Sequence, residues 1–336
     1  MRYRVLGRTG VRVSCIGLGC GGFGGIGSEV SLFGQGENEQ QAFDLMDRAL
    51  ELGINYLDTA DSYGGGRSEE IVGRWMASRN ARDHVVLATK VFNPMDSDQN
   101  SGGLSRRHIM RAVDDSLRRL QTERIDLYMA HQVDPVTDME ETVRAFNDLV
   151  RSGKVLYLGF CNIEPWRVVK SLWLSERLGA ARLECVQNEY NLLRRSVEAE
   201  MFPLVSSEDL SFTGYSPLAG GWLTGKYREG QAVPPGSRME LRPEPYSNLN
   251  NAETHRAIDR FRAIASEYGV SMGSLSLAWA TSHPSVTSIL AAPRNLDQFV
   301  MVEDALTLKL NAPDRQRIAN AVASGRDIEN ESMRTV

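Results

Sequence analysis

The stretch "INYLDTADSYGGG", Ile54 to Gly66, begins as an apolar run and ends in polar residues followed by three glycines. Its first half is typical of a buried strand. Two carboxylates and a phenol follow, from Asp58, Asp61 and Tyr63. A strand that leaves a hydrophobic core does not need these polar side chains. In parallel α/β folds, functional side chains gather beyond the carboxyl ends of the strands. The stretch therefore predicts a parallel sheet whose carboxyl edge carries the chemistry.

Similar apolar runs alternate with helix-period segments for nearly the whole chain, a pattern typical of βαβ units. The predicted strands of the sheet are residues 15–19, 55–60, 85–90, 125–131, 156–162, 185–191, 210–217 and 286–292. Eight strands with helical crossovers predict one (β/α)₈ TIM barrel of the α/β class over residues 1–336. We expect an N-terminal β-hairpin within 1–14, a long loop at 227–251 after the seventh strand, and a C-terminal helix and tail over 312–336.

A doubly wound open sheet is the competing architecture. Its dinucleotide-binding fingerprint, G-x-G-x-x-G, is matched at Gly19, Gly21 and Gly24. A helix does not follow promptly, however, so the match is weak. The barrel is therefore the favoured reading.

Composition excludes several classes of function. The chain has 336 residues, of which 42% are hydrophobic, and a formal net charge of −5, so it lacks the positive field that recruits nucleic acid or anionic membranes. No run is long enough to span a bilayer and the first residues lack a signal-peptide core, so we expect a cytoplasmic protein. The four cysteines stand singly, which predicts free thiols, and the five histidines form no H-x-H cluster. A metal site, as in a barrel hydrolase, is disfavoured.

Four ionisable residues are expected at one mouth of the barrel. Asp58, Lys90 and His131 end or follow consecutive strands, and Tyr63 stands in the loop after Asp58. A phenol ordinarily has a pKa of about 10, which an adjacent ammonium lowers, while a buried carboxylate keeps that lysine charged. Tyr63 is therefore the predicted general acid and base, tuned by Lys90 and Asp58, with His131 orienting a carbonyl oxygen.

The sequence resembles the aldo-keto reductases over nearly its full length. The motifs are "LDTADSYGGG", "ATK", "IDLYMAHQVD", "GKVLYLGFCN", "VQNEYNLL" and "YSPLAGGWLTGKY". The resemblance implies an oxidoreductase with the tetrad Asp58, Tyr63, Lys90 and His131. It also implies a nicotinamide cofactor, usually NADPH (NADP⁺) with NADH possible, that transfers hydride to an aldehyde or ketone without a Rossmann domain.

The resemblance also implies cofactor contacts. The family's Ser-Asn pair for the carboxamide is Cys161-Asn162 here, with Gln187 as its partner, and Tyr215 matches the ring beneath the nicotinamide. The residues matching the pyrophosphate segment are Ser216, Pro217, Leu218, Gly220, Leu223 and Lys226. Arg294 matches the basic contact to the 2′-phosphate, and Gln298 follows it. Met301 and Val302 replace a Glu-Asn pair that would hold the adenine, so weaker cofactor binding is expected.

The substrate is not fixed by these motifs. Phe92, Trp222 and Arg242 are expected among the pocket walls, and sugars, aryl aldehydes and secondary-metabolite ketones all remain open. The expected partner is a small carbonyl or alcohol. A second class of function also stays open, because relatives of the potassium-channel β subunits share this barrel and cofactor yet serve mainly as regulatory, cofactor-sensing proteins.

Overall fold

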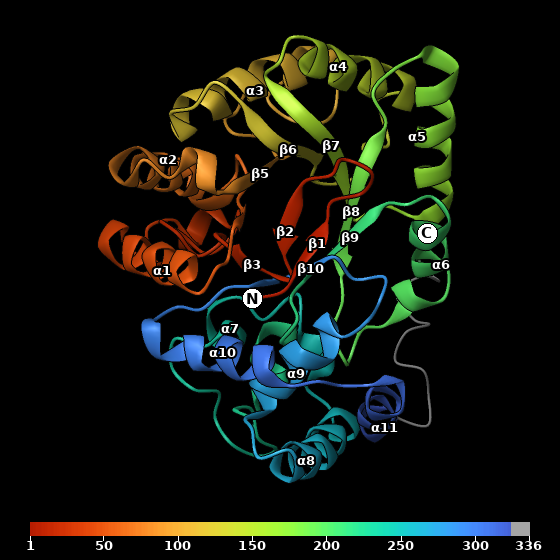
Figure 1. Cartoon of the computed structure of the whole chain (residues 1–336). Coiled ribbons are helices and arrows are strands. Elements are labelled where there is room, and N and C mark those ends of the chain that lie inside the picture. Colours follow the sequence, from red (N-terminus) through yellow and green to blue (C-terminus); the bar gives the residue numbers. More distant parts are fainter. Residues whose placement is uncertain (324–336) are drawn as a thin grey trace.

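The computed structural model describes residues 1–323, and the predicted polar tail at 324–336 lies outside them. Eight parallel strands close into a barrel surrounded by helices, which confirms the predicted TIM barrel (Figure 1). The strands are β3 (Ile16–Gly19), β4 (Tyr56–Asp58), β5 (Val86–Val91), β6 (Ile125–Ala130), β7 (Val155–Cys161), β8 (Leu183–Glu189), β9 (Ser211–Tyr215) and β10 (Ser288–Ala291). Neighbours in the chain are neighbours in the barrel, and β10 closes it by pairing Ile289 with Ile16.

Helices cover the outside of the barrel. They are α1 (Glu39–Glu51), α2 (Arg67–Arg79), α3 (Arg106–Leu120), α4 (Met139–Arg151), α5 (Pro165–Leu178), α6 (Met201–Ser207), α7 (Arg238–Leu241), α8 (Ala252–Glu267), α9 (Met272–Thr281), α10 (Phe299–Thr307) and α11 (Ala312–Val322). Local sequence sets their starts. Asn38 and Gln41 form a reciprocal capping box at α1, and the Ser105 side chain accepts from the His108 amide at α3.

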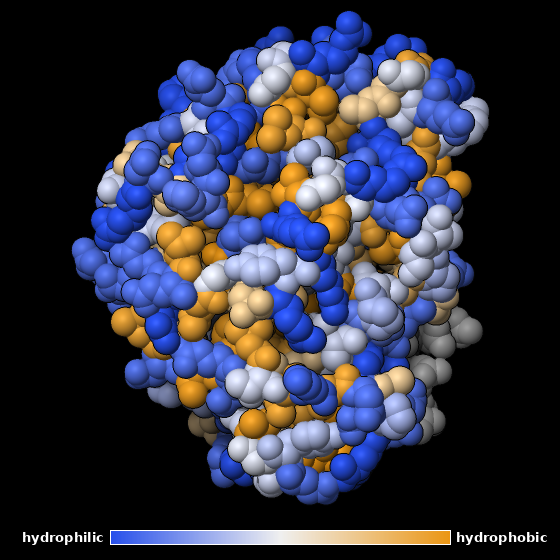
Figure 2. All heavy atoms as spheres, in the orientation of Figure 1, coloured by the Kyte–Doolittle hydropathy of each residue, from blue (hydrophilic) through white to orange (hydrophobic). Residues whose placement is uncertain are grey.

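The N-terminal hairpin closes the end of the barrel opposite the predicted mouth. Strands β1 (Tyr3–Val5) and β2 (Arg12–Ser14) pair antiparallel and cross the barrel in Figure 1. Leu6 and Val13 are fully buried and pack with residues of the barrel interior such as Tyr56 and Leu127. The same face in Figure 2 mixes hydrophilic and hydrophobic residues. Because this end is plugged, a ligand must enter from the other.

The segment after β9 is folded onto the barrel although it is mostly irregular. Tyr227, Met239 and Leu249 are buried, so it has its own apolar anchors. The Tyr246 hydroxyl lies 2.7 Å from Ser216 Oγ, and a Cβ atom at Gly220 would lie 2.5 Å from the Tyr246 ring. This part of the chain thus packs against the turn that leaves β9.

Candidate active site

The four predicted catalytic residues meet at the carboxyl end of the barrel. Asp58 is the last residue of β4, Lys90 lies in β5, and His131 directly follows β6. Tyr63 begins a 3₁₀ helix, Tyr63–Gly66. That turn requires glycine, because Gly64 has φ 59° and a Cβ atom there would lie 2.9 Å from the Gly24 carbonyl oxygen. The glycine run that follows the strand therefore sets the position of the phenol.

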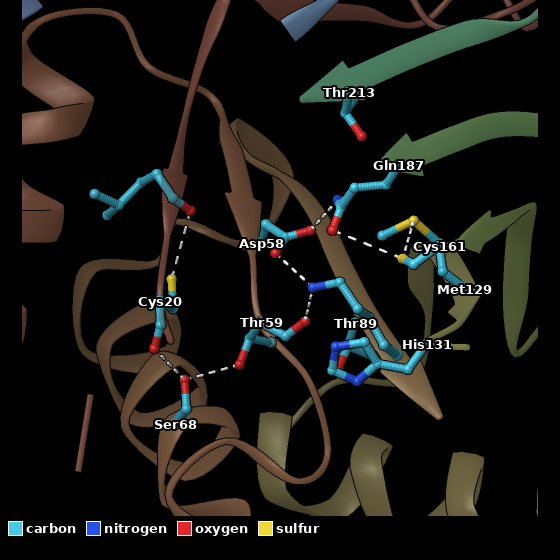
Figure 3. A network of polar contacts seen from close by, with 12 residues as sticks. Cys20, Asp58, Thr59, Ser68, Thr89, Met129, His131, Cys161, Gln187 and Thr213 are labelled. Atoms are coloured by element: carbon cyan, nitrogen blue, oxygen red, sulfur yellow. Dashed lines mark hydrogen bonds and ion pairs between the residues drawn. The ribbon is translucent and has the colours of Figure 1, made fainter. Parts of the chain in front are cut away.

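Asp58 is the centre of a buried hydrogen-bond network. Its Oδ1 lies 2.5 Å from the Lys90 ammonium, and its Oδ2 accepts from Gln187 Nε2 at 2.9 Å (Figure 3). Lys90 also donates to the Thr59 carbonyl at 2.8 Å. The Lys90 side chain is fully buried, and Asp58 beside it raises its pKa despite burial, so the lysine stays charged.

Tyr63 lies against both Lys90 and His131. The Lys90 ammonium is 5.0 Å from the centroid of the phenol ring, and the His131 ring meets that ring edge-on at 5.6 Å. Lys90 lowers the pKa of Tyr63, but burial outweighs it and the net pKa is raised. Lys90 thus acts on this pKa in the predicted direction, but the desolvation of the phenol is the larger effect and sets the net shift. A phenol that keeps its proton is a proton donor.

His131 is neutral at physiological pH. Burial, followed by the nearby Lys90 charge, lowers its pKa to about 3. The ring is held through its backbone, where the His131 amide donates to the Val91 carbonyl at 2.9 Å. A neutral imidazole donates one N–H, which suits the predicted role of orienting a carbonyl oxygen.

Asp61 belongs to a different cluster from Asp58. It is fully buried, and burial followed by the nearby Glu69 raises its pKa well above the usual range. Glu69 accepts from Thr89 at 2.6 Å and pairs with Arg119 at 2.7 Å. The two carboxylates of the opening stretch thus separate: Asp58 meets the lysine at the mouth, and Asp61 lies near the Glu69–Arg119 pair.

The residues predicted to hold the carboxamide border the same mouth. Asn162 adopts a left-handed conformation with φ 52°, donates to the His131 carbonyl at 3.0 Å and accepts from the Tyr215 hydroxyl at 2.8 Å. Asn162 is exposed, while Tyr215 is partly exposed. Cys161 Sγ donates to Gln187 Oε1 at 3.7 Å, a weak contact because a thiol is a poor donor. The Gln187 amide nitrogen donates to Asp58. An open amide and an aromatic ring thus stand next to the tetrad.

The turn after β9 presents mainly backbone groups, rather than side chains, to a ligand. Its 3₁₀ helix, Ala219–Thr224, contains Gly220 at φ 63° and Gly221 at φ 99°. Leu223 is fully buried in the core, and the Pro217 carbonyl accepts from Ser276. Trp222 is also buried and packs on His255 of α8. The expectation that Trp222 lines the substrate pocket is therefore wrong, because its ring points into the core.

Cations gather where the phosphates are expected. Lys226 is near enough to Arg294 and Arg238 that their charges, after burial, lower its pKa. The pKa of Arg238 is lowered as well, by burial and then by Arg242 and Arg294. Arg238 was missed by the sequence reasoning, because one arginine in an irregular segment carries no periodic signal. Like charges brought together this way favour an anionic ligand.

Arg294 stands beside these cations and joins three segments. Its Nε lies 2.8 Å from Glu37 Oε1, and its Nη1 donates to the Gly236 carbonyl at 2.9 Å. Gln298 turns back onto this loop, accepting from the Arg294 amide at 2.9 Å. Val302 is buried in the core, so its side chain is not available for an adenine.

Comparison with known proteins identifies the family that this barrel and site define. A model of the Aldo/keto reductase family matches residues 16–323. The chain belongs to that family.

Three relatives show its range. The chain is 37% identical to "Uncharacterized oxidoreductase YrpG" of Bacillus subtilis, covering 93% of each chain. It is 35% identical to "Probable voltage-gated potassium channel subunit beta" of Oryza sativa subsp. japonica, covering 99% of this chain and 100% of that one. It is 36% identical to "Versiconal hemiacetal acetate reductase" of Aspergillus parasiticus, covering 85% and 87%. The names thus span oxidoreductases and a channel subunit.

Two features of residues 1–323 bear on other classes of site. Within that range, no helix is both long and apolar enough to cross a membrane. No group of three or more His, Cys, Asp or Glu side chains in the same range is arranged to hold a metal ion. All four cysteines are free and buried.

Proposed function

We propose that the protein is an NADPH-dependent reductase that converts an aldehyde or ketone to an alcohol. The observation that carries this proposal is the cluster of Tyr63, Lys90, Asp58 and His131 at the carboxyl end of the barrel. Together they supply a proton donor, a buried cation and a neutral hydrogen-bond donor. These are the groups that carbonyl reduction requires of the protein.

Each residue has a distinct task. Tyr63 gives its proton to the carbonyl oxygen, and Lys90 stabilises the phenolate that remains. Asp58 keeps Lys90 charged at 2.5 Å, and Gln187 holds Asp58 in turn. His131, whose pKa is lowered to about 3, orients the carbonyl as a neutral donor.

The residues present fit a nicotinamide dinucleotide. When bound, that cofactor supplies the hydride. Asn162 and Tyr215 are open at the mouth to receive its carboxamide and ring. Ser216, Pro217, Leu218, Gly220 and Leu223 offer mainly backbone to the pyrophosphate. Lys226, Arg238 and Arg294 supply the positive charge that its phosphates need, and Arg294 would meet the 2′-phosphate.

Steady-state turnover tests this function. The purified protein, given NADPH and a panel of aldehydes and ketones, should oxidise many equivalents of cofactor per active site. Tyr63→Phe should abolish that turnover while retaining cofactor binding. Binding without repeated turnover on any carbonyl would overturn the enzymatic proposal.

That negative outcome would favour a second function, cofactor sensing by a regulatory protein. The relative from Oryza sativa is named as a channel subunit and aligns with 99% of this chain. The tetrad gives this chain the groups for chemistry, so we place the enzyme first.

A further inference from the structure

Glu37 is a buried carboxylate that no catalytic step uses. It ends the loop between β3 and α1 and is only 5% exposed. Its amide donates to the Gly22 carbonyl at 2.8 Å, and its own carbonyl accepts from the Gly24 amide at 2.9 Å. A Cβ atom at Gly22 would lie 2.0 Å from Glu37 Oε2, so a side chain at that position would displace the carboxylate. The backbone and the side chain of Glu37 thus both pack against the loop after β3.

The carboxylate lies among the cations of the candidate phosphate site. It pairs with Arg294 at 2.8 Å, and the charges of Arg294 and Arg238 both act to lower its pKa. Burial is the larger effect and raises that pKa overall. A carboxylate weakens the binding of phosphate at a site that is otherwise assembled from cations. The presence of Glu37 there therefore calls for a functional explanation.

Arg294 already makes hydrogen bonds to other groups of the protein. Its Nε is taken by Glu37 and its Nη1 donates to Gly236. A phosphate at this guanidinium would share it with a carboxylate, and two anions on one cation repel each other. A ribose with a free hydroxyl would suffer no such repulsion.

We propose that Glu37 is a specificity-determining residue that reduces the preference for the 2′-phosphorylated cofactor. It does so by neutralising part of the Arg294 charge. This inference rests on the proposed function, in which Arg294 meets the 2′-phosphate. The expected preference for NADP⁺ over NAD⁺ is therefore smaller than the preference that Arg294 would give without Glu37.

The test is a binding measurement by titration calorimetry, with NADP⁺ and NAD⁺ as probes. Glu37→Gln keeps an oxygen that can accept from Arg294 but removes the charge. The expected result is a Kd for NADP⁺ lowered about three- to tenfold, with the Kd for NAD⁺ unchanged. Glu29→Gln is the matched control, because it removes a charge from the same loop. Within residues 1–323, the Glu29 carboxylate accepts a hydrogen bond from Ser31 alone. It should change neither Kd.

A double-mutant cycle separates charge from architecture. In an Arg294→Ala background, where Glu37 has no Arg294 charge to neutralise, Glu37→Gln should change the Kd for NADP⁺ less than it does alone. If Glu37→Gln weakens NADP⁺, or shifts both cofactors equally, Glu37 is a structural partner of Arg294 and the inference is wrong. Failure of the unaltered protein to bind either dinucleotide would instead overturn the proposed function, and this inference with it.

Discussion

The two ends of the barrel mouth are built on opposite principles. At the candidate catalytic end, each charge has its partner within the protein: Lys90 pairs with Asp58, and Gln187 donates to the other oxygen of that carboxylate. At the candidate phosphate end, Lys226, Arg238 and Arg294 lie together, and Glu37 is the carboxylate paired to Arg294. The charges of the first end are paired within the protein, whereas the positive charge gathered at the second would be balanced by an anionic ligand. Mutations should therefore act on chemistry at one end and on affinity at the other.

The largest expected effect comes from Tyr63→Phe. Turnover should fall about a hundredfold or more, because the proton donor is lost, while the Kd for NADPH should stay unchanged. Stopped-flow or steady-state kinetics with fluorescence binding checks both values. Near-normal turnover would remove Tyr63 from the mechanism.

Lys90→Met tests whether the catalytic end is self-contained. Asp58 would keep a buried, uncompensated charge, so we expect a loss of about 3–5 kcal/mol in the free energy of unfolding as well as a loss of turnover. Denaturant titration measures the stability. The double variant Lys90→Met/Asp58→Asn should recover part of the stability but none of the turnover. A stable single variant would contradict the pairing.

The lowered pKa of His131 predicts that the folded protein loses stability as the pH becomes acidic. Its pKa is lowered to about 3 in the folded protein, from about 6.5 in the unfolded chain. Below pH 6.5 the unfolded state takes up a proton that the folded state refuses, so stability falls as the pH drops. Between pH 6.5 and 5 this loss amounts to about 1–2 kcal/mol.

Denaturation midpoints across that pH range check the prediction, with His131→Gln flattening the slope. His283, whose pKa is lowered to about 4 mainly by burial, adds a slope of its own that His131→Gln should leave in place. An unaltered slope in His131→Gln would show that this histidine is not the source.

The smallest expected effect comes from the phosphate end. Arg294→Ala should raise the Kd for NADPH about tenfold and leave that for NADH nearly unchanged, because only one cofactor carries the 2′-phosphate. Arg238→Ala should weaken both, since a pyrophosphate is common to them. Equal losses for both cofactors in Arg294→Ala would make Arg294 a structural residue.

The difference between the two ends also explains which residues could be predicted from the sequence. Asp58, Lys90 and His131 could be predicted because each ends or follows a strand, and strand ends of a barrel converge. The backbone turn at Tyr63 was signalled by its glycines. Arg238 and Glu37 carry no such signal, because they stand in irregular segments whose course depends on packing.

The sequence by itself determined the barrel, since eight apolar runs alternating with amphipathic helices leave few other ways to bury them. It also predicted that Asp58, Lys90 and His131 lie at one end of the barrel, because the carboxyl ends of parallel strands converge there. Only the tertiary structure decided the pKa of Tyr63, because the net shift depends on how deeply the ring is buried against the Lys90 charge. Only the tertiary structure brought Glu37 to Arg294 across 257 positions, since a contact between loops depends on distance in space and leaves no local pattern.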